Sequence, residues 1–290
     1  MKAGFIGLGH MGNGMSKNVL KANGQLLVSD LSDEAKALLK AEGADVAESN
    51  AQVAKECDVI FLSLPMPAHV RGVVAGPDGL IENGHEGQYI IDLSTVDSDT
   101  SKDMAEAAAK KGIKFIDFPV SGGVSGAQAG TLAIMAGCNE EDVAEIRNLI
   151  DAIGKTVFIG TIGGGSTMKL INNFMAFAHL VTDAEGVLMA DQLGIDINTF
   201  FDVVLNASGY DKPLSLKKNK IIENEYSPNF AIDLVVKDLN LAAEVCKNNN
   251  IPNYSLNQAL QMYRMAQNRG LGQMDTIAIV GMLREIMPVK

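Results

Sequence analysis

Residues 2–30 decide the fold, and they read KAGFIGLGHMGNGMSKNVLKANGQLLVSD. A short apolar run ends in a glycine-rich segment, a stretch compatible with a helix follows, and a second apolar run ends at Asp30. Gly7 permits a tight turn after the strand, Gly9 lets the backbone approach a pyrophosphate, and Gly12 allows the helix to pack closely on the strand. Asp30 lies where a carboxylate accepts hydrogen bonds from ribose hydroxyls. This order predicts a dinucleotide-binding unit; the alternative is a structural glycine-rich turn in another α/β fold.

The composition is that of a globular protein. The chain has 290 residues, 47% of them hydrophobic, and a formal net charge of −11. Because nucleic acids and anionic membranes attract basic surfaces, we expect neither as a partner. No apolar run approaches the ~20 residues of a membrane span, and glycines interrupt the first apolar run, which therefore does not resemble a signal peptide. The widely spaced Cys57, Cys138 and Cys246 indicate a reducing, cytoplasmic location and no metal site.

Apolar runs alternate with helical patterns in the first half of the chain. The runs that predict parallel strands, covered on both faces, are residues 3–6, 26–29, 59–64, 89–93 and 114–118. A helix is expected over 97–111, with a cap among Asp97, Ser98 and Asp99 and its end at Gly112. Two further strands, at 131–136 and 156–159, flank an acidic helix at 140–150. The pattern predicts an α/β fold with a doubly wound Rossmann-type sheet and an extension.

The pattern becomes helical after the three glycines at 163–165. Ser166 or Thr167 is expected to cap a long helix that ends near Gly194. Further helices are predicted at residues 197–206, 214–223, 231–248, 255–268 and 276–287. We therefore expect an NAD-binding Rossmann domain over 1–163 and a separate all-α domain for substrate binding and oligomerisation over 164–290. The long helix has apolar residues on several sides, which predicts a homodimer or homotetramer held mainly by the C-terminal half.

Lys169 and Asn173 follow these glycines and are four residues apart, so they share a face of the expected helix. A lysine in an otherwise apolar first turn is a candidate general acid and base, because desolvation and a positive helix terminus lower its pKa. Asn173 could hold a substrate oxygen and orient the ammonium group. From this segment alone, a surface lysine beside a structural asparagine is an equal alternative.

Three further segments carry polar groups. Ser121, Gly122 and Gly123 follow a strand at the sheet edge where ligands bind, and a hydroxyl with exposed backbone amides suits a carboxylate. Thr95 also follows a strand and could touch the nicotinamide side of a dinucleotide. Lys237, in a predicted helix of the second domain, could reach back across the cleft, although a solvated helix charge is the more common role.

Together these segments resemble the β-hydroxyacid dehydrogenase family over essentially the whole chain. The resemblance rests on GFIGLGHMGNGM, DLST, DFPVSGG, GTLAIMAG, the spacing of residues 163–173 and KDL at 237–239. It implies that Lys169 is the catalytic acid and base, that Asn173 binds substrate, and that residues 121–123 hold the substrate carboxylate. Phe118 stands where the family usually has alanine, and Cys138 stands where a second glycine is common. Of these two departures from the family pattern, only Phe118 concerns the detail of the substrate pocket.

The resemblance also implies the cofactor contacts and the reaction. The residues expected to contact NAD are Gly7, Leu8, Gly9, His10, Met11, Gly12, Asp30, Leu64, Pro65, Thr95 and Lys237. Asp30 would repel a ribose 2′-phosphate, and Leu31 stands where NADP-using relatives often carry arginine. The expected reaction is oxidation of a small 3-hydroxy acid by NAD. Two alternatives remain: reduction of small aldehydes such as succinic semialdehyde or glyoxylate, and a non-catalytic nucleotide-binding module.

Overall fold

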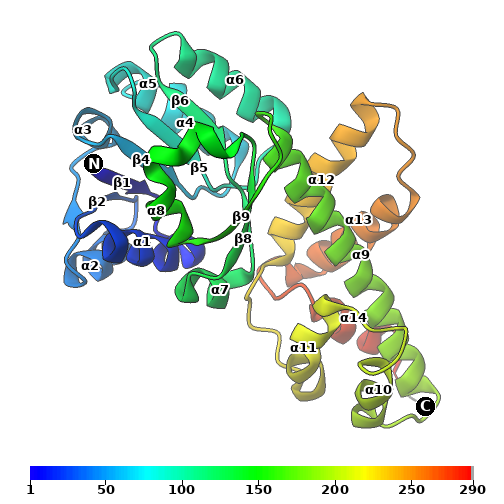
Figure 1. Ribbon diagram of the computed structural model, residues 1–290. Coiled ribbons are helices and arrows are strands. Elements are labelled where there is room, and N and C mark those ends of the chain that lie inside the picture. The colour runs from blue at the N-terminus through cyan, green and yellow to red at the C-terminus, as the bar shows by residue number, and fades with distance from the viewer. Residues whose placement is uncertain (289–290) are drawn as a thin grey trace. The chain divides into compact units, whose positions relative to one another are not determined.

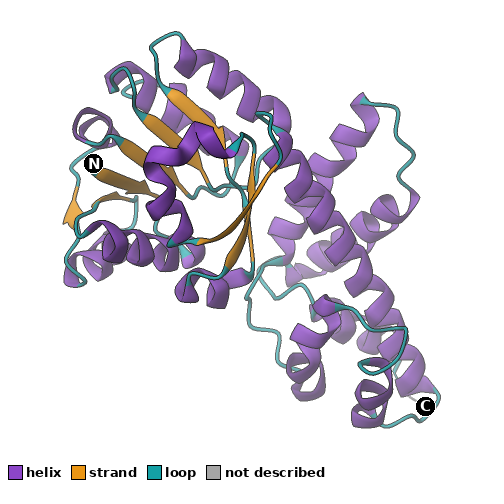
Figure 2. Cartoon of the chain, viewed as in Figure 1, coloured by secondary structure: helices purple, strands orange, loops and turns teal. Residues whose placement is uncertain are grey.

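The computed structural model describes residues 1–288, which fall into two compact units. The first unit ends at Lys169 and the second begins at Leu170, inside the long helix α9 (Gly164–Gln192). All named strands belong to the first unit (Figure 2). The predicted Rossmann-type sheet followed by a helical domain is therefore confirmed, whereas the domain division expected between residues 163 and 164 stays a prediction.

The first unit is built on a sheet of six parallel strands (Figure 1). Their spatial order is β3-β2-β1-β4-β5-β6. The order in which strands are added to the sheet therefore changes sides between β1 and β4, and ligands bind at this point in sheets of this type. The strands are β1 (Ala3–Ile6), β2 (Leu27–Ser29), β3 (Asp45–Val46), β4 (Val59–Leu62), β5 (Tyr89–Asp92) and β6 (Lys114–Asp117). The two-residue β3 was not predicted from the sequence.

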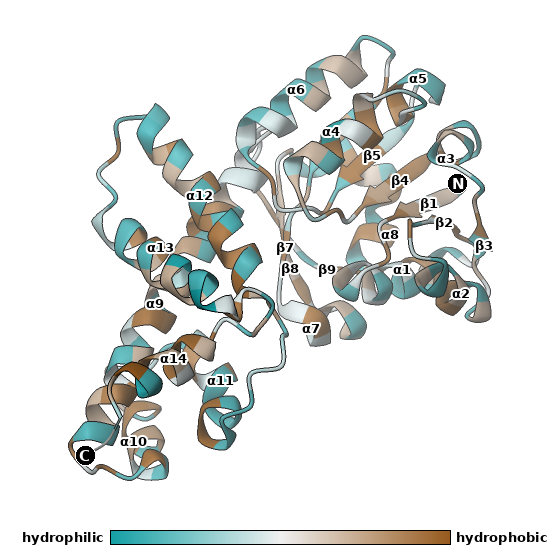
Figure 3. Cartoon of the chain, turned by 180° about the vertical axis from the view of Figure 1, so that it is seen from behind, coloured by the Kyte–Doolittle hydropathy of each residue, from teal (hydrophilic) through white to brown (hydrophobic). Residues whose placement is uncertain are grey.

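Both faces of this sheet are buried, which explains the continuous apolar runs. Phe5 and Phe61 lie on one face with ring centroids 6.0 Å apart, and Ile6 and Ile60 point to the other. The Phe5 face packs against α1 (His10–Asn23), α2 (Asp33–Ala41), α7 (Gly123–Ala129) and α8 (Arg147–Asp151). The Ile6 face packs against α3 (Asn50–Glu56), α4 (Pro67–Ala75), α5 (Leu80–Asn83) and α6 (Ser98–Ala109). In Figure 3 the apolar colour follows β4 and β5.

A second, three-stranded sheet completes the first unit. It consists of β7 (Val120–Ser121), β8 (Leu132–Ala136) and β9 (Gly154–Phe158), with β7 antiparallel and β9 parallel to β8. The acidic helix expected at 140–150 is two pieces, a 3₁₀ segment η1 (Glu140–Ile146) followed by α8. The two meet at Ile146, which has φ −111° and ψ 10°, and Val143 inside η1 also leaves helical geometry, at φ −124° and ψ 15°.

The predicted helix caps are partly right. Asp97 caps α6 by accepting the amide of Thr100 at 2.7 Å, as expected. Neither Ser166 nor Thr167 caps the long helix, because α9 already begins at Gly164 and each hydroxyl has another partner. The Ser166 hydroxyl is 2.9 Å from that of Ser101, and the Thr167 hydroxyl donates to the carbonyl of Gly163.

The second unit is helical and has its own apolar core. Besides α9 it contains α10 (Ile197–Val204), α11 (Lys212–Glu223), α12 (Ile232–Asn248), α13 (Tyr254–Ala266), a π-helical segment η2 (Gln267–Leu271) and α14 (Ala278–Ile286). The core includes Phe177, Leu239 and Tyr263, and the rings of Phe177 and Tyr263 meet edge to face at 6.1 Å. Across residues 1–288, no helix combines the length and the apolarity that a membrane span requires.

One acidic group is buried in the second unit. Asp183, on α9, is 8% exposed. Burial, together with the neighbouring carboxylate of Asp211, raises the pKa of Asp183 to about 8. In the unfolded chain an aspartate titrates at about 4. Between these values the folded protein holds a proton that the unfolded chain has lost, so this group makes stability fall as the pH rises.

We predict that Asp183→Asn removes this pH dependence, because an amide does not titrate. The melting temperature of the wild type should fall from pH 5 to pH 8 by more than that of the variant, as measured by thermal unfolding at several pH values. The matched control is Glu185→Gln, an exposed position on the same helix, which should keep the wild-type slope. Equal slopes for Asp183→Asn and the wild type would show that Asp183 is already ionised in the folded protein.

Candidate active site

The glycine loop between β1 and α1 has the backbone geometry that dinucleotide binding requires. Gly7 has a φ of +94°, and a side chain on Gly12 would collide with the carbonyl of Gly7, 1.9 Å from its Cβ. At Gly9 a Cβ would meet no described atom within 4 Å, so no contact within the described chain demands glycine there. A glycine with open space at the N-terminus of a 14-residue helix fits the approach of a pyrophosphate.

Asp30 lies directly after β2, beside this loop. One carboxylate oxygen accepts the amide of Leu8 at 2.5 Å, and the other accepts the amide of Ser32 at 2.7 Å. The contact with Leu8 places the carboxylate against the glycine loop, where the sequence predicted it. Each carboxylate oxygen can accept a further hydrogen bond, so both remain usable by ribose hydroxyls. The adjacent Leu31 is fully exposed.

The ends of β4 and β5 lie next to the same loop. A Cβ on Gly7 would come within 3.2 Å of the Leu64 side chain, and the amide of Leu64 donates to the Ser94 hydroxyl at 2.9 Å. The amide of Ser94 in turn donates to Asp92 at 3.0 Å. Pro65 is exposed and Thr95 is half-buried. Three predicted cofactor residues thus follow strands whose carboxyl ends adjoin the glycine loop.

Ser121, Gly122 and Gly123 form the transition from β7 to α7. Ser121 is half-buried and pairs with Ala133 of β8, whereas the two glycines are exposed. Gly122 and Gly123 have φ values of +141° and +67°, which other residues adopt only with strain. The segment therefore presents a hydroxyl beside exposed backbone in a conformation that glycine permits.

Asp117, at the end of β6, holds the start of α9. Its fully buried carboxylate accepts the amides of Gly163 at 2.9 Å and Ser166 at 2.8 Å. A side chain on Gly137 would collide with this carboxylate, 2.0 Å from its Cβ, and one on Gly165 would collide with the Met135 carbonyl at 2.2 Å. The glycines therefore allow the helix terminus to approach the strand ends closely.

Lys169 lies one turn after this anchored terminus. It is 7% exposed, an unusual degree of burial for a lysine. The contact between Ser166 and Ser101 ties the same turn of α9 to α6. The surface-lysine alternative is therefore wrong, because the Lys169 side chain is buried and follows a helix start that both Asp117 and Ser101 contact.

Asn173 and Lys237 are joined by a residue that the sequence analysis did not single out. Asp238, on α12, is 1% exposed. It accepts the Asn173 amide Nδ2 at 2.7 Å on one oxygen and pairs with the Lys237 ammonium at 2.9 Å on the other. Lys237 is thus not a solvated helix charge, since its side chain is 11% exposed.

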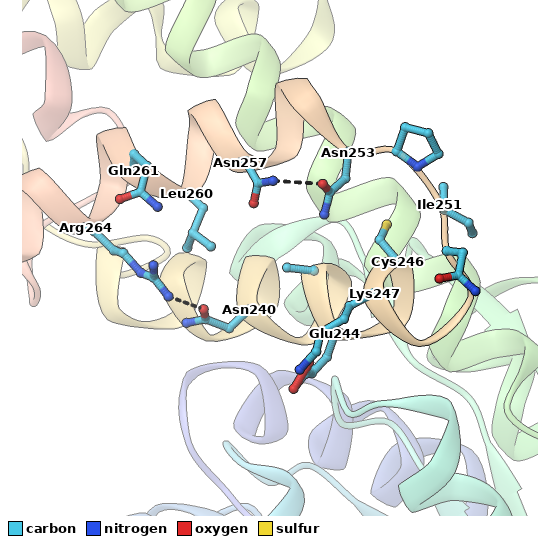
Figure 4. Close-up of a pocket in the computed structure, with 13 residues that line it drawn as sticks. Asn240, Glu244, Cys246, Lys247, Ile251, Asn253, Asn257, Leu260, Gln261 and Arg264 are labelled. Carbon is cyan, nitrogen blue, oxygen red and sulfur yellow. Dashed lines mark hydrogen bonds and ion pairs between the residues drawn. The ribbon is translucent and has the colours of Figure 1, made fainter.

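A separate pocket of about 770 Å³ lies between α12 and α13 (Figure 4). Five of its thirteen lining residues carry amide side chains, and two hydrogen bonds join lining residues, from Arg264 to Asn240 at 2.7 Å and from Asn257 to Asn253 at 2.8 Å. None of the residues predicted to bind cofactor or substrate lines it.

The structure brings the predicted residues of each unit together. In the first unit, Asp30 contacts the glycine loop, Leu64 lies beside Gly7, and Lys169 follows the helix start fixed by Asp117. In the second, Asn173 and Lys237 share Asp238. Asp117 and Asp238 were missed as functional residues, although each lies in a sequence segment that already looked important. An acidic residue inside an otherwise apolar strand or helix face is the signal that would have indicated them.

Two family models account for nearly the whole chain. Residues 2–163 match the NAD binding domain of 6-phosphogluconate dehydrogenase. Residues 163–283 match the NAD-binding domain of NADP-dependent 3-hydroxyisobutyrate dehydrogenase.

Named relatives agree with these models. The chain is 36% identical to 2-(hydroxymethyl)glutarate dehydrogenase of Eubacterium barkeri, over 97% of this chain and 94% of that protein. It is 31% identical to L-threonate dehydrogenase of Escherichia coli, over 96% and 93%. The crystal structure of 3-hydroxyisobutyrate dehydrogenase from Salmonella typhimurium superposes with a TM-score of 0.89 at 31% identity, over 97% and 99%. The chain belongs to the β-hydroxyacid dehydrogenase family. It is an enzyme that oxidises a hydroxy acid with a nicotinamide dinucleotide, which decides against the non-catalytic alternative.

We predict that Asp117→Asn lowers kcat at least about tenfold. An amide has one acceptor oxygen, so the amide of Gly163 or Ser166 would face an NH₂ group, and the first turn of α9 would shift. A buried donor without an acceptor costs about 1–3 kcal/mol, so the melting temperature should fall as well. Steady-state kinetics and thermal unfolding measure both effects.

The control for this variant is Asp142→Asn, which removes a carboxylate that caps η1 in the same unit. It should lower stability without lowering kcat. A normal kcat in Asp117→Asn would mean that turnover does not depend on this anchor.

Proposed function

We propose that the enzyme oxidises a small 3-hydroxy acid of the 3-hydroxyisobutyrate type with NAD, giving the semialdehyde or oxo acid. The observation that carries this proposal is the buried Lys169, one turn into a helix whose start is fixed by Asp117. The named relatives, 2-(hydroxymethyl)glutarate dehydrogenase and L-threonate dehydrogenase, are named for different hydroxy acids.

Lys169 takes the proton in this reaction. A nicotinamide dinucleotide held by the glycine loop and Asp30 would supply the acceptor for the hydride of the hydroxyl-bearing carbon. The neutral amine of Lys169 accepts the hydroxyl proton as the carbon–oxygen double bond forms, and the ammonium returns it in the reverse direction. Asn173, four residues further along the same helix, binds the substrate oxygen. Ser121 and the backbone of Gly122 and Gly123 hold the carboxylate, so that the hydroxyl is oriented toward Lys169.

We assign NAD rather than NADP as the preferred cofactor. The carboxylate of Asp30 lies against the glycine loop, where it would accept hydrogen bonds from ribose hydroxyls and repel a 2′-phosphate. Leu31 beside it is uncharged and exposed, and offers no positive group to a phosphate.

We also propose that the protein is a homodimer or homotetramer and that it resides in a reducing cytoplasm. In this proposal, residues 164–290 form the domain for substrate binding and oligomerisation. The exposed face of α9 carries a row of large apolar side chains, Met168, Ile171, Met175 and Met189, each at least 41% exposed. A surface of this kind favours subunit contact.

The buried thiols of Cys57 and Cys138, with pKa values raised by burial to about 12, suit a compartment where cysteines stay reduced.

For the cofactor, we predict that Asp30→Ala lowers the ratio of kcat/KM with NAD to that with NADP at least about tenfold. The variant loses the ribose contacts and the repulsion of the phosphate together. Initial rates with both cofactors give the ratio, and Asp33→Ala, at an exposed acidic residue in the first turn of α2, serves as the control. A wild type that turns over NADPH as well as NADH would contradict the assignment.

For the acid and base, we predict that Lys169→Ala lowers kcat at least about 10²-fold, the usual scale for a lost general acid or base. The affinity for NADH, measured by fluorescence titration, should change little because the glycine loop is intact. Lys155→Ala, at an exposed lysine of β9, should keep normal kinetics. If Lys169→Ala retained near-normal turnover, another group would have to move the proton.

For the assembly, we predict a mass of two or four chains by light scattering at micromolar concentration. Met175→Glu places a charge in the exposed apolar row of α9 and should shift the mass toward one chain. Met66→Glu, at a 39% exposed methionine outside α9, is the matched control. A monomeric wild type would overturn this proposal.

A further inference from the structure

Asp238 is a buried carboxylate that accepts a hydrogen bond on one oxygen and forms an ion pair through the other. The amide of Asn173 donates to one oxygen at 2.7 Å, and the ammonium of Lys237 lies 2.9 Å from the other. The side chain is 1% exposed, so these contacts take the place of water. Buried charges persist where such partners compensate the loss of hydration, which explains why an acid is tolerated on the inner face of α12.

We propose that Asp238 is a positioning residue that fixes the amide of Asn173 in the one orientation useful for the reaction. The inference rests on the proposed function, in which Asn173 binds the substrate oxygen. An ionised carboxylate only accepts hydrogen bonds. Asn173 must therefore present its NH₂ group to Asp238, because the flipped amide would set its own oxygen against the carboxylate.

The fixed orientation decides what Asn173 offers to the substrate. One N–H is committed to Asp238, and the second N–H remains available to donate to the substrate oxygen. The carbonyl oxygen Oδ1 is kept on the opposite side, where it accepts the side-chain amide of Asn172 at 3.2 Å. A donor aimed at the substrate oxygen is most useful as that oxygen becomes a carbonyl, so the orientation favours turnover.

Because Lys237 is also a donor, an amide cannot replace the carboxylate of Asp238 without losing one contact. Both partners of Asp238 are donors, and each meets a different oxygen. Asp238→Asn keeps the shape but places an NH₂ group against either Lys237 or Asn173. The conflict is relieved only when the lysine moves away or when the Asn173 amide flips. Asp238→Glu changes the shape but keeps two acceptors.

The kinetic test compares these two variants. We expect Asp238→Asn to lower kcat at least about tenfold and Asp238→Glu to retain more activity. A role in packing alone predicts the opposite order, since asparagine matches the shape of aspartate. In an Asn173→Ala background, Asp238→Asn should lower kcat less than about threefold further, because no amide remains to be oriented. If the losses in kcat from Asn173→Ala and Asp238→Asn multiplied in full in the double variant, the inference would be overturned.

The matched control is Asp233→Asn on the same helix. Asp233 also accepts two side-chain hydrogen bonds, from Gln267 at 2.7 Å and Gln273 at 2.6 Å, but neither partner is a proposed site residue. Its loss should lower stability with kcat unchanged and should not interact with Asn173→Ala. A kcat loss equal to that of Asp238→Asn would mean that any damage to α12 has this effect, which would overturn the inference.

A direct readout separates this inference from the proposed function. In the wild type, the side-chain NH₂ resonances of Asn173, observed by NMR on ¹⁵N-labelled protein, should exchange slowly with water and shift in Asp238→Asn. Rapid exchange in the wild type overturns the inference without any variant having to fold. Normal turnover in Lys169→Ala would instead remove the proposed acid and base while leaving the orientation of Asn173 as measured.

Discussion

The carboxylate of Asp117 is the contact on which the candidate site depends. It joins the last strand of the large sheet to the first turn of α9 by accepting two backbone amides, those of Gly163 and Ser166. A helix terminus leaves such amides without partners inside the helix, so a buried terminus needs acceptors from elsewhere. Asp117 supplies them and fixes the first turn of α9, and therefore the place of Lys169 in the first unit.

Close approach around this contact explains the glycines that the sequence displays. Gly137 and Gly165 have no room for a Cβ because the carboxylate and a strand carbonyl occupy the space. Gly12 is constrained in the same way by the carbonyl of Gly7, whereas Gly9 is not constrained by any described atom. Gly12, Gly137 and Gly165, which neighbouring atoms of the described chain require, can thus be distinguished from Gly9, where a Cβ would meet no such atom.

The second unit also contains buried acidic residues, and their neighbours differ. Asp238 contacts Asn173 and Lys237 through its two oxygens, whereas burial, together with the neighbouring Asp211, raises the pKa of Asp183 to about 8. One buried acid is paired with donors, and the other is buried beside a second acid, which raises its pKa. The difference follows from their neighbours, a cation in one case and a second carboxylate in the other.

The sequence by itself determined the fold class, the glycine loop with Asp30, and the spacing of Lys169 and Asn173, because these depend on local periodicity and on residues close together in the chain. It also indicated the family, through several motifs in one order. Only the tertiary structure decided the start of α9 at Gly164 and the contacts of Asp117 and Asp238. These depend on partners 46 to 65 positions away, such as Gly163 for Asp117 and Asn173 for Asp238, and no local pattern specifies which distant donor a buried carboxylate will meet.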